Sequence, residues 1–317
     1  MSDRLVPRVD IVVATYGQPE LLGNCLRSLK AMDFRDYRLI VVDDGSPEPA
    51  LPVVQQAHPG ATVLRASRNG GLVRALNRGI QHGDAPLLAL LNDDTEVSQG
   101  WLGALVDASN RHPYAASFAS KILLFDDPPR FHSAGDGFGV WGMPYNRGVW
   151  LDDLGQYDAE EPVFGACAGA ALYRRSSLSA VAILGDAILD PRLFMYLEDV
   201  DLAWRLRRSG LECIYIPTAI VKHRLSASGG GRLASYYVSR NIWSVLLRST
   251  PRSVIRKHWR RILFHHVGRS FRHLRHSRSP DARASLRGTL AGIAGAFPAA
   301  LSGWSSDEAY IDTHLTH

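Results

Sequence analysis

Adjacent acidic residues stand directly after two apolar runs of strand length, as Asp43 and Asp44 and as Asp93 and Asp94. Neighbouring carboxylates at a strand end repel one another unless a cation or hydrogen-bond donors compensate. Mg²⁺ and Mn²⁺ take oxygen ligands, which they share among one or two carboxylates, water and substrate phosphates. Asp93 and Asp94 therefore indicate a divalent-cation site, with an Asx turn that caps the next helix as the alternative. For Asp43 and Asp44, an acceptor for a base or ribose is as reasonable as a metal ligand.

Two further motifs lie at the starts of expected helices. Residues 68–71 read Arg-Asn-Gly-Gly, so their backbone N–H groups and the positive helix end could approach a phosphate. Glu198 and Asp199 begin another helix, where carboxylates in the first turn are favourable against the helix dipole with no function required. Because Asp199 and Asp201 cannot both cap the same donors, a carboxylate left facing a cleft is a candidate general base.

His223 follows an apolar pair at an expected strand end and precedes a loop of serine and glycine at residues 226–231. An isolated histidine is more often structural than a ligand, so its role depends on whether it lies near Asp94. Residues 135–139 resemble a dinucleotide-binding fingerprint, but they neither follow a clear strand nor open a helix, so that interpretation is rejected.

The elements that must position these side chains alternate between strands and helices along the chain. Apolar runs of strand length alternate with stretches of helical spacing, which predicts an α/β fold with a mostly parallel sheet and sites at the carboxyl ends of its strands. The predicted strands are 9–14, 38–43, 62–64, 86–91 and 211–217, and the predicted helices are 20–30, 72–82, 101–111, 199–209 and 236–248. Residues 126–162 are expected to form long loops and short strands.

Composition is ordinary for a globular enzyme, because the 317 residues are 46% hydrophobic and 21% charged. Cys25, Cys167 and Cys213 lie far apart, which excludes a disulfide scaffold or a zinc finger, and we expect all three to be reduced. The first residues lack the features of a signal peptide, so we expect a cytoplasmic protein. We predict a catalytic domain over residues 1–248 and a basic helical region over residues 249–317.

The basic region combines cations with an apolar stripe. Residues 248–287 carry 12 Lys or Arg against 1 Asp or Glu. Apolar side chains at helical spacing between residues 254 and 275 fit adsorption to an anionic membrane surface, on the inner face of the cytoplasmic membrane. The alternative is a helical hairpin that packs on the catalytic domain or on a partner subunit in a homo-oligomer. Residues 288–304 are uncharged, but their Gly, Ala and Pro content falls short of a transmembrane helix.

The ordered motifs resemble the family 2 inverting glycosyltransferases of GT-A fold, and most of all their rhamnosyltransferase-like, O-antigen-type members. The resemblance runs from about residue 9 to residue 248 and rests on VVATYGQPELL, VVDDGS, SRNGGLVRALNRGI, LALLNDDTEV, FGACAGAALYRR, MYLEDVDLAWRLRRSG and VKH. It implies a nucleoside-diphosphate sugar donor, a saccharide or lipid-linked saccharide acceptor, a divalent Mg²⁺ or Mn²⁺ ion and single displacement at the sugar. Deoxythymidine-diphosphate rhamnose is the donor that the subgroup suggests.

The resemblance also assigns roles to individual residues. It implies that Asp199 is the catalytic base, that Glu198 supports acceptor binding, and that Asp94 and His223 hold the metal. The family's motif often reads D-x-D, whereas this chain has Asn92 at the first position, so Asp94 is the principal ligand. The nucleotide-sugar contacts that it implies are Thr15, Tyr16, Asp43, Asp44, Arg68, Asn69, Gly70 and Asp93.

Two other functions are compatible with parts of the sequence. A nucleotidyltransferase acting on sugar phosphates also uses carboxylates and metal, but it would generally have a basic, glycine-rich loop near the N-terminus, and residues 14–17 supply none. A noncatalytic nucleic-acid-binding protein would explain the basic stretch. It would not require the acidic clusters, and no recognition motif accompanies the cations, so we expect no nucleic-acid partner.

Overall fold

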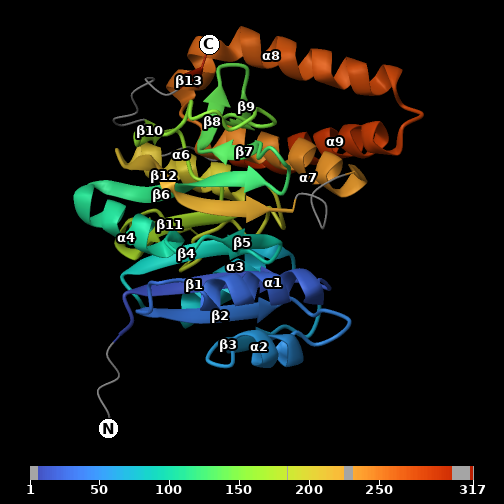
Figure 1. The fold of residues 1–317 in the computed structure, drawn as a ribbon. Coiled ribbons are helices and arrows are strands. Elements are labelled where there is room, and N and C mark those ends of the chain that lie inside the picture. The colour runs from blue at the N-terminus through green and yellow to red at the C-terminus, as the bar shows by residue number, and fades with distance from the viewer. Residues whose placement is uncertain (1–5, 184, 225–230, 302–314, 317) are drawn as a thin grey trace.

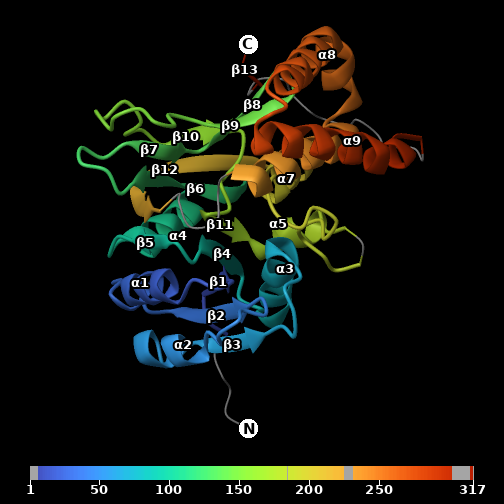
Figure 2. The same cartoon turned by 90° about the vertical axis from the view of Figure 1, so that its right-hand side faces the viewer.

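The computed structural model describes residues 6–183, 185–224, 231–301 and 315–316. Its centre is a ten-stranded mixed sheet with the order β10-β12-β6-β11-β4-β1-β2-β3, in which β5 also pairs with β12 and β7 with β6. Helices cover both faces of this sheet (Figures 1 and 2). The strands are β1 (Val9–Thr15), β2 (Tyr37–Asp43), β3 (Thr62–Arg65), β4 (Leu87–Asn92), β5 (Thr95–Val97), β6 (Ala115–Leu124), β7 (Phe131–Ala134), β10 (Glu161–Val163), β11 (Ala170–Arg174) and β12 (Glu212–His223).

The strands β1, β2, β3 and β4 run parallel, whereas β11 is antiparallel to both β4 and β6. Every residue of β1 is buried, and its side chains alternate between two cores because successive side chains of a strand point to opposite faces. Ile11 and Val13 pack in the core under α1, α2 and α4, while Val12 lies in the core under α3, α5 and α6. The predicted α/β sheet is confirmed.

Helices cover the two faces. They are α1 (Pro19–Lys30), α2 (Leu51–Ala57), α3 (Leu72–His82), α4 (Trp101–Arg111), α5 (Arg175–Ala180) and α6 (Glu198–Arg208). Those predicted at 20–30, 72–82, 101–111 and 199–209 begin and end within one residue of the predicted bounds, whereas the sequence did not predict those at 51–57 and 175–180. The start of α3 depends on Gly71, whose φ is +92° and where a Cβ would stand 2.4 Å from Cδ2 of Phe194. Only glycine fits this position, because both the backbone conformation and the aromatic contact exclude a side chain.

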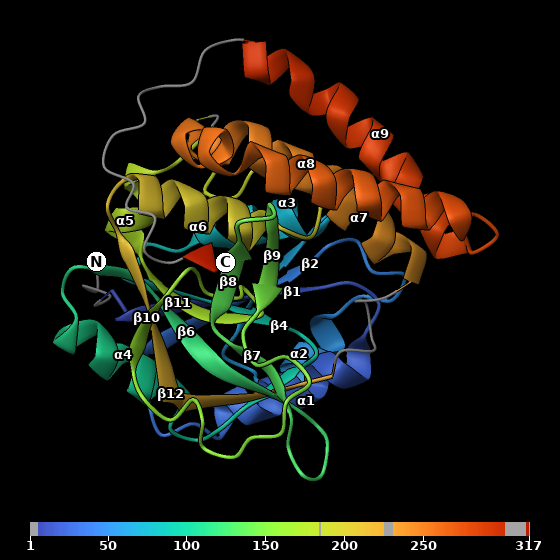
Figure 3. The ribbon, with the colours of Figure 1, turned by 90° about the horizontal axis from the view of Figure 1, so that it is seen from above.

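A second, three-stranded sheet and a helical layer lie beyond the β10–β12 side of the main sheet (Figure 1). The small sheet contains β8 (Asp136–Gly139), β9 (Met143–Asn146) and β13 (Leu315–Thr316). The helices are α7 (Gly231–Ser244), α8 (Arg252–Arg275) and α9 (Pro280–Leu301), and a π-helical turn, Val245–Ser249, follows α7. Seen from above, α8 runs past the end of the β8–β9 hairpin (Figure 3). Trp204 of α6 packs with Phe138 and Ile242 in a core that joins this layer to α6.

Several expectations change in detail. The strand predicted to end at residue 217 continues to His223, and β6 is a fully buried strand that the sequence did not predict. The helix predicted at 236–248 starts at Gly231, and the predicted domain boundary falls in the π-helical turn. The serine and glycine loop lies outside the described residues except for its last position. All three cysteines are free, as predicted. Among the described residues, every helix is too short or too polar to cross a membrane.

Candidate active site

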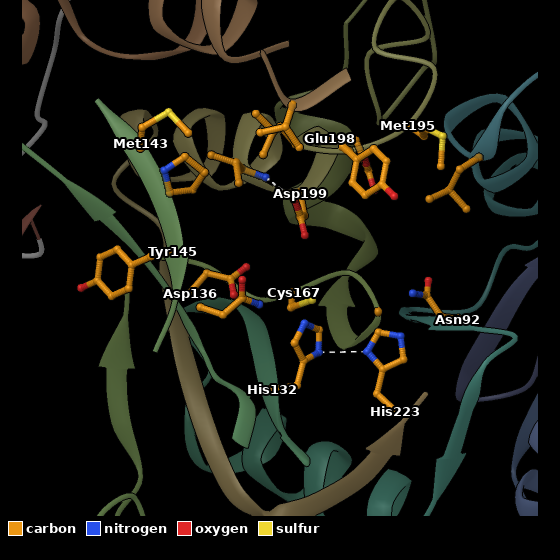
Figure 4. Close-up of a pocket in the computed structure, with 18 of the residues that line it drawn as sticks. Asn92, His132, Asp136, Met143, Tyr145, Cys167, Met195, Glu198, Asp199 and His223 are labelled. Atoms are coloured by element: carbon orange, nitrogen blue, oxygen red, sulfur yellow. Dashed lines mark hydrogen bonds between the residues drawn. The ribbon is translucent and has the colours of Figure 1, made fainter. Parts of the chain in front are cut away.

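Two adjoining cavities meet at the carboxyl end of β4. Asn92 and Asp94 line both of them, while Asp93 lines the smaller. The smaller cavity has a volume of about 230 Å³ and lies against the ends of β1 and β4 and the start of α3. The larger, of about 380 Å³, lies between β9, the start of α6 and the end of β12 (Figure 4). Segments that are far apart in the sequence therefore line two cavities that are separated by Asn92 and Asp94.

The smaller cavity collects most of the residues that the sequence assigned to the nucleotide sugar. Its lining includes Thr15, Tyr16, Asp44, Asn69 and Asp93. The Asp44 carboxylate accepts hydrogen bonds from the backbone N–H of Gly70 at 3.0 Å and of Gly71 at 2.8 Å. Asp44 thereby fixes the glycine turn before α3, and it also lines the cavity.

Asp43 and Arg68 lie outside the linings of both cavities. The fully buried Asp43 accepts hydrogen bonds from the N–H of Ser46 and of Ala50 and from the Arg65 guanidinium, at 2.7–3.0 Å. These donors occupy the carboxylate and hold the turn after β2. Arg68 is exposed, and its backbone passes 2.6 Å from where a Cβ on Gly45 would lie. Each of the two residues directly precedes a residue that lines the smaller cavity, namely Asp44 and Asn69.

The buried side chains of Asp94 and His223 form a chain with the half-buried His132. His223 Nε2 lies 2.9 Å from Asp94 Oδ1, and His223 Nδ1 lies 2.9 Å from His132 Nδ1 (Figure 4). Burial, together with the nearby His223, lowers the pKa of His132 to about 3, so its imidazole is neutral at physiological pH. A neutral His132 can accept a hydrogen bond at Nδ1 from His223 Nδ1–H, which leaves the Nε2 lone pair of His223 directed at Asp94.

This chain suits a hard divalent cation. Two adjacent ligands of one octahedral ion are about 3 Å apart when metal–ligand bonds are near 2.1 Å, and the facing atoms of Asp94 and His223 are separated by 2.9 Å. A histidine that ligates metal usually donates its other N–H to a neighbouring acceptor, which His132 supplies here. Burial and the Asp94 charge raise the pKa of Asp93 to about 7, although the Thr15 hydrogen bond opposes the shift. A cation would lower the repulsion within this acidic pair.

Asp199 faces the larger cavity from the first turn of α6. Its Oδ2 accepts a hydrogen bond from Ala168 N–H at 3.2 Å and its Oδ1 accepts one from Val200 N–H at 2.8 Å. Burial raises its pKa, while these backbone donors oppose the shift. Asp201 has a different environment, because it pairs with Arg205 and accepts a hydrogen bond from Ser249. The carboxylate left facing a cleft is therefore Asp199.

Two further carboxyl groups lie beside Asp199. Asp136 of β8 is buried, accepts a hydrogen bond from Ser133 Oγ at 3.1 Å and points toward Asp199 (Figure 4). Ligand atoms of Asp136, Cys167 and Asp199 lie within 4.8 Å of one another, the only such group of three among the described residues. Burial and the Asp199 charge raise the pKa of Asp136 far above its usual range, and they raise the pKa of Glu198 to about 8.

The segment before α6 has an unusual backbone. Phe194, Tyr196 and Leu197 have φ values of +67°, +66° and +65°, which residues with side chains rarely adopt. Asn241 of α7 is fully buried, and its Nδ2 donates to the carbonyls of Leu193, Met195 and Tyr196 at 2.8–3.0 Å. Such strain persists where the surroundings fix it, often beside a functional site.

His132, Asp136 and Asn241 are the site residues that sequence reasoning missed. Asp136 lies in the glycine-rich stretch that was rejected as a dinucleotide fingerprint, and that stretch forms a strand, β8, rather than the start of a helix. His132 precedes it by four residues. The local sequence around His132 and Asp136 does not indicate that these residues lie beside His223 and Asp199. Asn241 lies inside a predicted helix without any local signal.

The chain is similar in sequence to known glycosyltransferases. The family model described as "Glycosyl transferase family 2" matches residues 10–181. An N-acetylglucosaminyl-diphospho-decaprenol L-rhamnosyltransferase of Mycobacterium tuberculosis is 28% identical over 253 residues, which cover 73% of this chain and 80% of that protein. The galactofuranosyltransferase GlfT1 of Mycolicibacterium smegmatis is 27% identical over 245 residues, covering 71% and 76%.

Solved structures show the same fold at low identity. GalNAc-T7, crystallised with UDP, GalNAc and Mn²⁺, superposes with a TM-score of 0.58 at 15% identity, covering 78% of this chain and 50% of that one. The mannosyltransferase PcManGT from Pyrobaculum calidifontis, in complex with GDP-Man and Mn²⁺, gives 0.58 at 14% identity, covering 93% and 76%. The fold is of GT-A type, as the sequence predicted.

Proposed function

Because the chain belongs to glycosyl transferase family 2, we propose that it moves a sugar from a nucleoside-diphosphate sugar to an acceptor hydroxyl with inversion at the anomeric carbon. The observation that carries the proposal is the wall shared by the two cavities. Asp94 and His223 border the larger cavity on one side, and Asp199 enters it from the start of α6. A sugar held between them would have its leaving group and its attacking hydroxyl on opposite sides.

We assign the smaller cavity to the nucleoside diphosphate. Thr15, Tyr16, Asp44, Asn69 and Asp93 line it and supply hydrogen-bonding groups for a base, a ribose and phosphates. Tyr16 is 48% exposed, so its ring is available to stack on a base. Gly70 belongs to the turn that Asp44 fixes, while Asp43 and Arg68 would act by holding the adjacent loops in place.

In the chemical step, Asp199 would accept the proton of the acceptor hydroxyl as its oxygen attacks the anomeric carbon. The bond from that carbon to the diphosphate oxygen breaks at the same time, and the diphosphate leaves from the opposite face. A general base must lie within about 2.6–3.2 Å of the hydroxyl in the productive complex. A divalent cation on Asp94 and His223 would stabilise the negative charge of the departing diphosphate.

The neighbours of Asp199 favour this role. The pKa of Glu198 is raised to about 8 and that of Asp136 is also raised, so both groups favour their uncharged forms more than an ordinary carboxyl group does. Two neutral acids beside Asp199 leave the negative charge on the group that has the two backbone donors. Glu198 also lines the larger cavity, where it can orient the acceptor.

For the substrates, we propose rhamnose as the transferred sugar and a lipid-linked saccharide as the acceptor. The support is the similarity to the M. tuberculosis rhamnosyltransferase, whose name specifies a decaprenol-linked acceptor. A lipid-linked acceptor would place the enzyme peripherally on the inner face of the cytoplasmic membrane. Family membership favours glycosyl transfer over both the nucleotidyltransferase and the nucleic-acid-binding alternatives.

A thermal-shift panel tests the proposal. The full chain is heated with nucleoside diphosphates and nucleotide sugars, each with and without Mn²⁺, and the best donor is then incubated with candidate acceptors. We expect stabilisation by a nucleoside-diphosphate sugar that requires the cation, followed by formation of a glycoside. Stabilisation by nucleic acid alone, or the consumption of a sugar phosphate with a nucleoside triphosphate, would contradict the assignment.

A further inference from the structure

The helix α8 presents an apolar face to solvent. Six of its apolar side chains are between 49% and 73% exposed, namely those of Trp259, Leu263, Phe264, Val267, Phe271 and Leu274. At 100° per residue these positions fall on one side of the helix. Val254 and His258 fall on the opposite side, and His266 falls at the edge of the apolar side beside Trp259; all three are buried. The apolar stripe that the sequence indicated is thus present, and it faces away from the rest of the protein. Ile262 is the exception, because it packs inward.

The same outward face carries positive charge. Arg256 and Arg260 are exposed and lie among the apolar positions, and Arg275 lies at their edge. The 24 residues of α8 include no Asp or Glu. A symmetric contact between two copies of this helix would bring like charges together, which is unfavourable. An anionic lipid surface complements both properties, since it accepts apolar side chains below a layer of negative headgroups.

One side of α8 contacts the turn before β9 and the first residue of that strand, which walls the larger cavity. His266 Nε2 lies 3.3 Å from the Gly142 carbonyl oxygen, and Arg269 Nη1 lies 3.6 Å from Met143 Sδ. Met143 and Tyr145 of β9 line that cavity. The outward face of α8 is therefore only about one helix diameter, 10–12 Å, from the cavity wall. Figure 1 shows α8 as the outermost element above β8 and β9.

We propose that the outward face of α8 binds the surface of an anionic phospholipid bilayer and so holds the larger cavity beside the headgroups. Trp259, Phe264 and Phe271 would enter the interface while Arg256 and Arg260 contact phosphates. This inference rests on the proposed function in one respect only, the lipid-linked nature of the acceptor. The placement gives such an acceptor a short path, because its saccharide would extend from the bilayer along β9 toward Asp199.

Vesicle co-sedimentation of the full chain tests the inference. Vesicles of phosphatidylcholine alone are compared with vesicles that also contain phosphatidylglycerol. We expect binding to the anionic vesicles that weakens with salt. Replacing Phe264 and Phe271 together by Ser should weaken it at least about tenfold, because two large apolar side chains no longer leave water. Arg256→Gln and Arg260→Gln should each weaken it about fivefold.

The matched control is Tyr114→Ser, which removes an aromatic side chain that is 88% exposed just before β6. It should bind vesicles like the wild type. Absent binding, equal binding to neutral vesicles, or equal binding by the Phe264 and Phe271 variant would each overturn the inference. So would a wild-type dimer that the two Ser substitutions dissociate, because a second copy would then cover this face.

The test separates this inference from the proposed function. Vesicle binding needs no sugar donor, so normal binding without any glycosyl transfer would refute the function alone. With a water-soluble acceptor, the Phe264 and Phe271 variant should keep the wild-type turnover, because its substitutions lie on the far side of α8 from the cavity. Loss of that turnover would contradict the outward placement of the stripe.

Discussion

Replacement of Asp199 by Asn tests the assignment of the general base. The two carboxylate oxygens accept hydrogen bonds from Ala168 N–H and Val200 N–H. An Asn oxygen can keep one of these bonds, but its NH₂ group must then face the other N–H, and it offers no basic lone pair to the acceptor hydroxyl. Loss of a positioned general base typically lowers turnover by about 10²–10⁴-fold. Loss of one buried hydrogen bond costs roughly 1–3 kcal/mol of unfolding free energy.

The assay must separate these two effects. Turnover is measured as nucleoside diphosphate released at saturating donor and acceptor, at a temperature where circular dichroism shows the variant to be folded. Nucleotide affinity is measured by calorimetry and should change little, because Asp199 lines the larger cavity and the nucleotide is assigned to the smaller. A folded variant that turns over within threefold of the wild type would remove Asp199 from the role of base.

Other predictions concern the metal, the pH dependence and the strained segment. Asp94→Ala should abolish the cation-dependent part of nucleotide binding, and His132→Ala should weaken Mn²⁺ affinity about 10–100-fold by releasing His223; calorimetry that shows unchanged, cation-independent binding would refute both. Because the folded pKa of Glu198 is raised from 4.5 to about 8, its contribution to stability is complete below pH 4.5 and is lost as pH rises through 8. The thermal stability of Glu198→Gln relative to the wild type should therefore be greater at pH 9 than at pH 6. The same difference in melting temperature between the two proteins at pH 6 and at pH 9 would contradict this. Asn241→Leu leaves three buried carbonyls without their donor and should lower the unfolding free energy by roughly 1–3 kcal/mol or more, with turnover falling as well, as urea denaturation and rate assays would show.

The sequence predicts the parallel strands β1 to β4 and the polar residues at their ends, because both are local signals. The β-branched apolar residues of Val9–Thr15 indicate a buried strand, and the polar residues after β4 mark the carboxyl end of that strand. Parallel strands bring such ends to one edge, so Asp44 and Asp93 could be expected to lie near one cavity. The functional roles of the motif residues come from family resemblance and stay predictions.

The residues that the sequence did not reveal depend on tertiary contacts. Whether His132 faces His223 depends on the pairing of β7 and β12 with β6, which no local pattern encodes. Asp136 becomes a neighbour of Asp199 only when β8 packs beside α6. For α8, helical spacing gives a stripe, but only the packing of the helix against the turn before β9 shows which side is exposed.

The stereochemistry of the product tests the central claim most directly. The donor that gives the largest cation-dependent stabilisation is incubated with an acceptor, and the anomeric configuration of the new glycoside is read by nuclear magnetic resonance. The site predicts one glycoside of inverted configuration for each nucleoside diphosphate released, and loss of that product in the Asp199→Asn variant. A glycoside of retained configuration, or release of nucleoside diphosphate without any glycoside, would contradict direct displacement at this site.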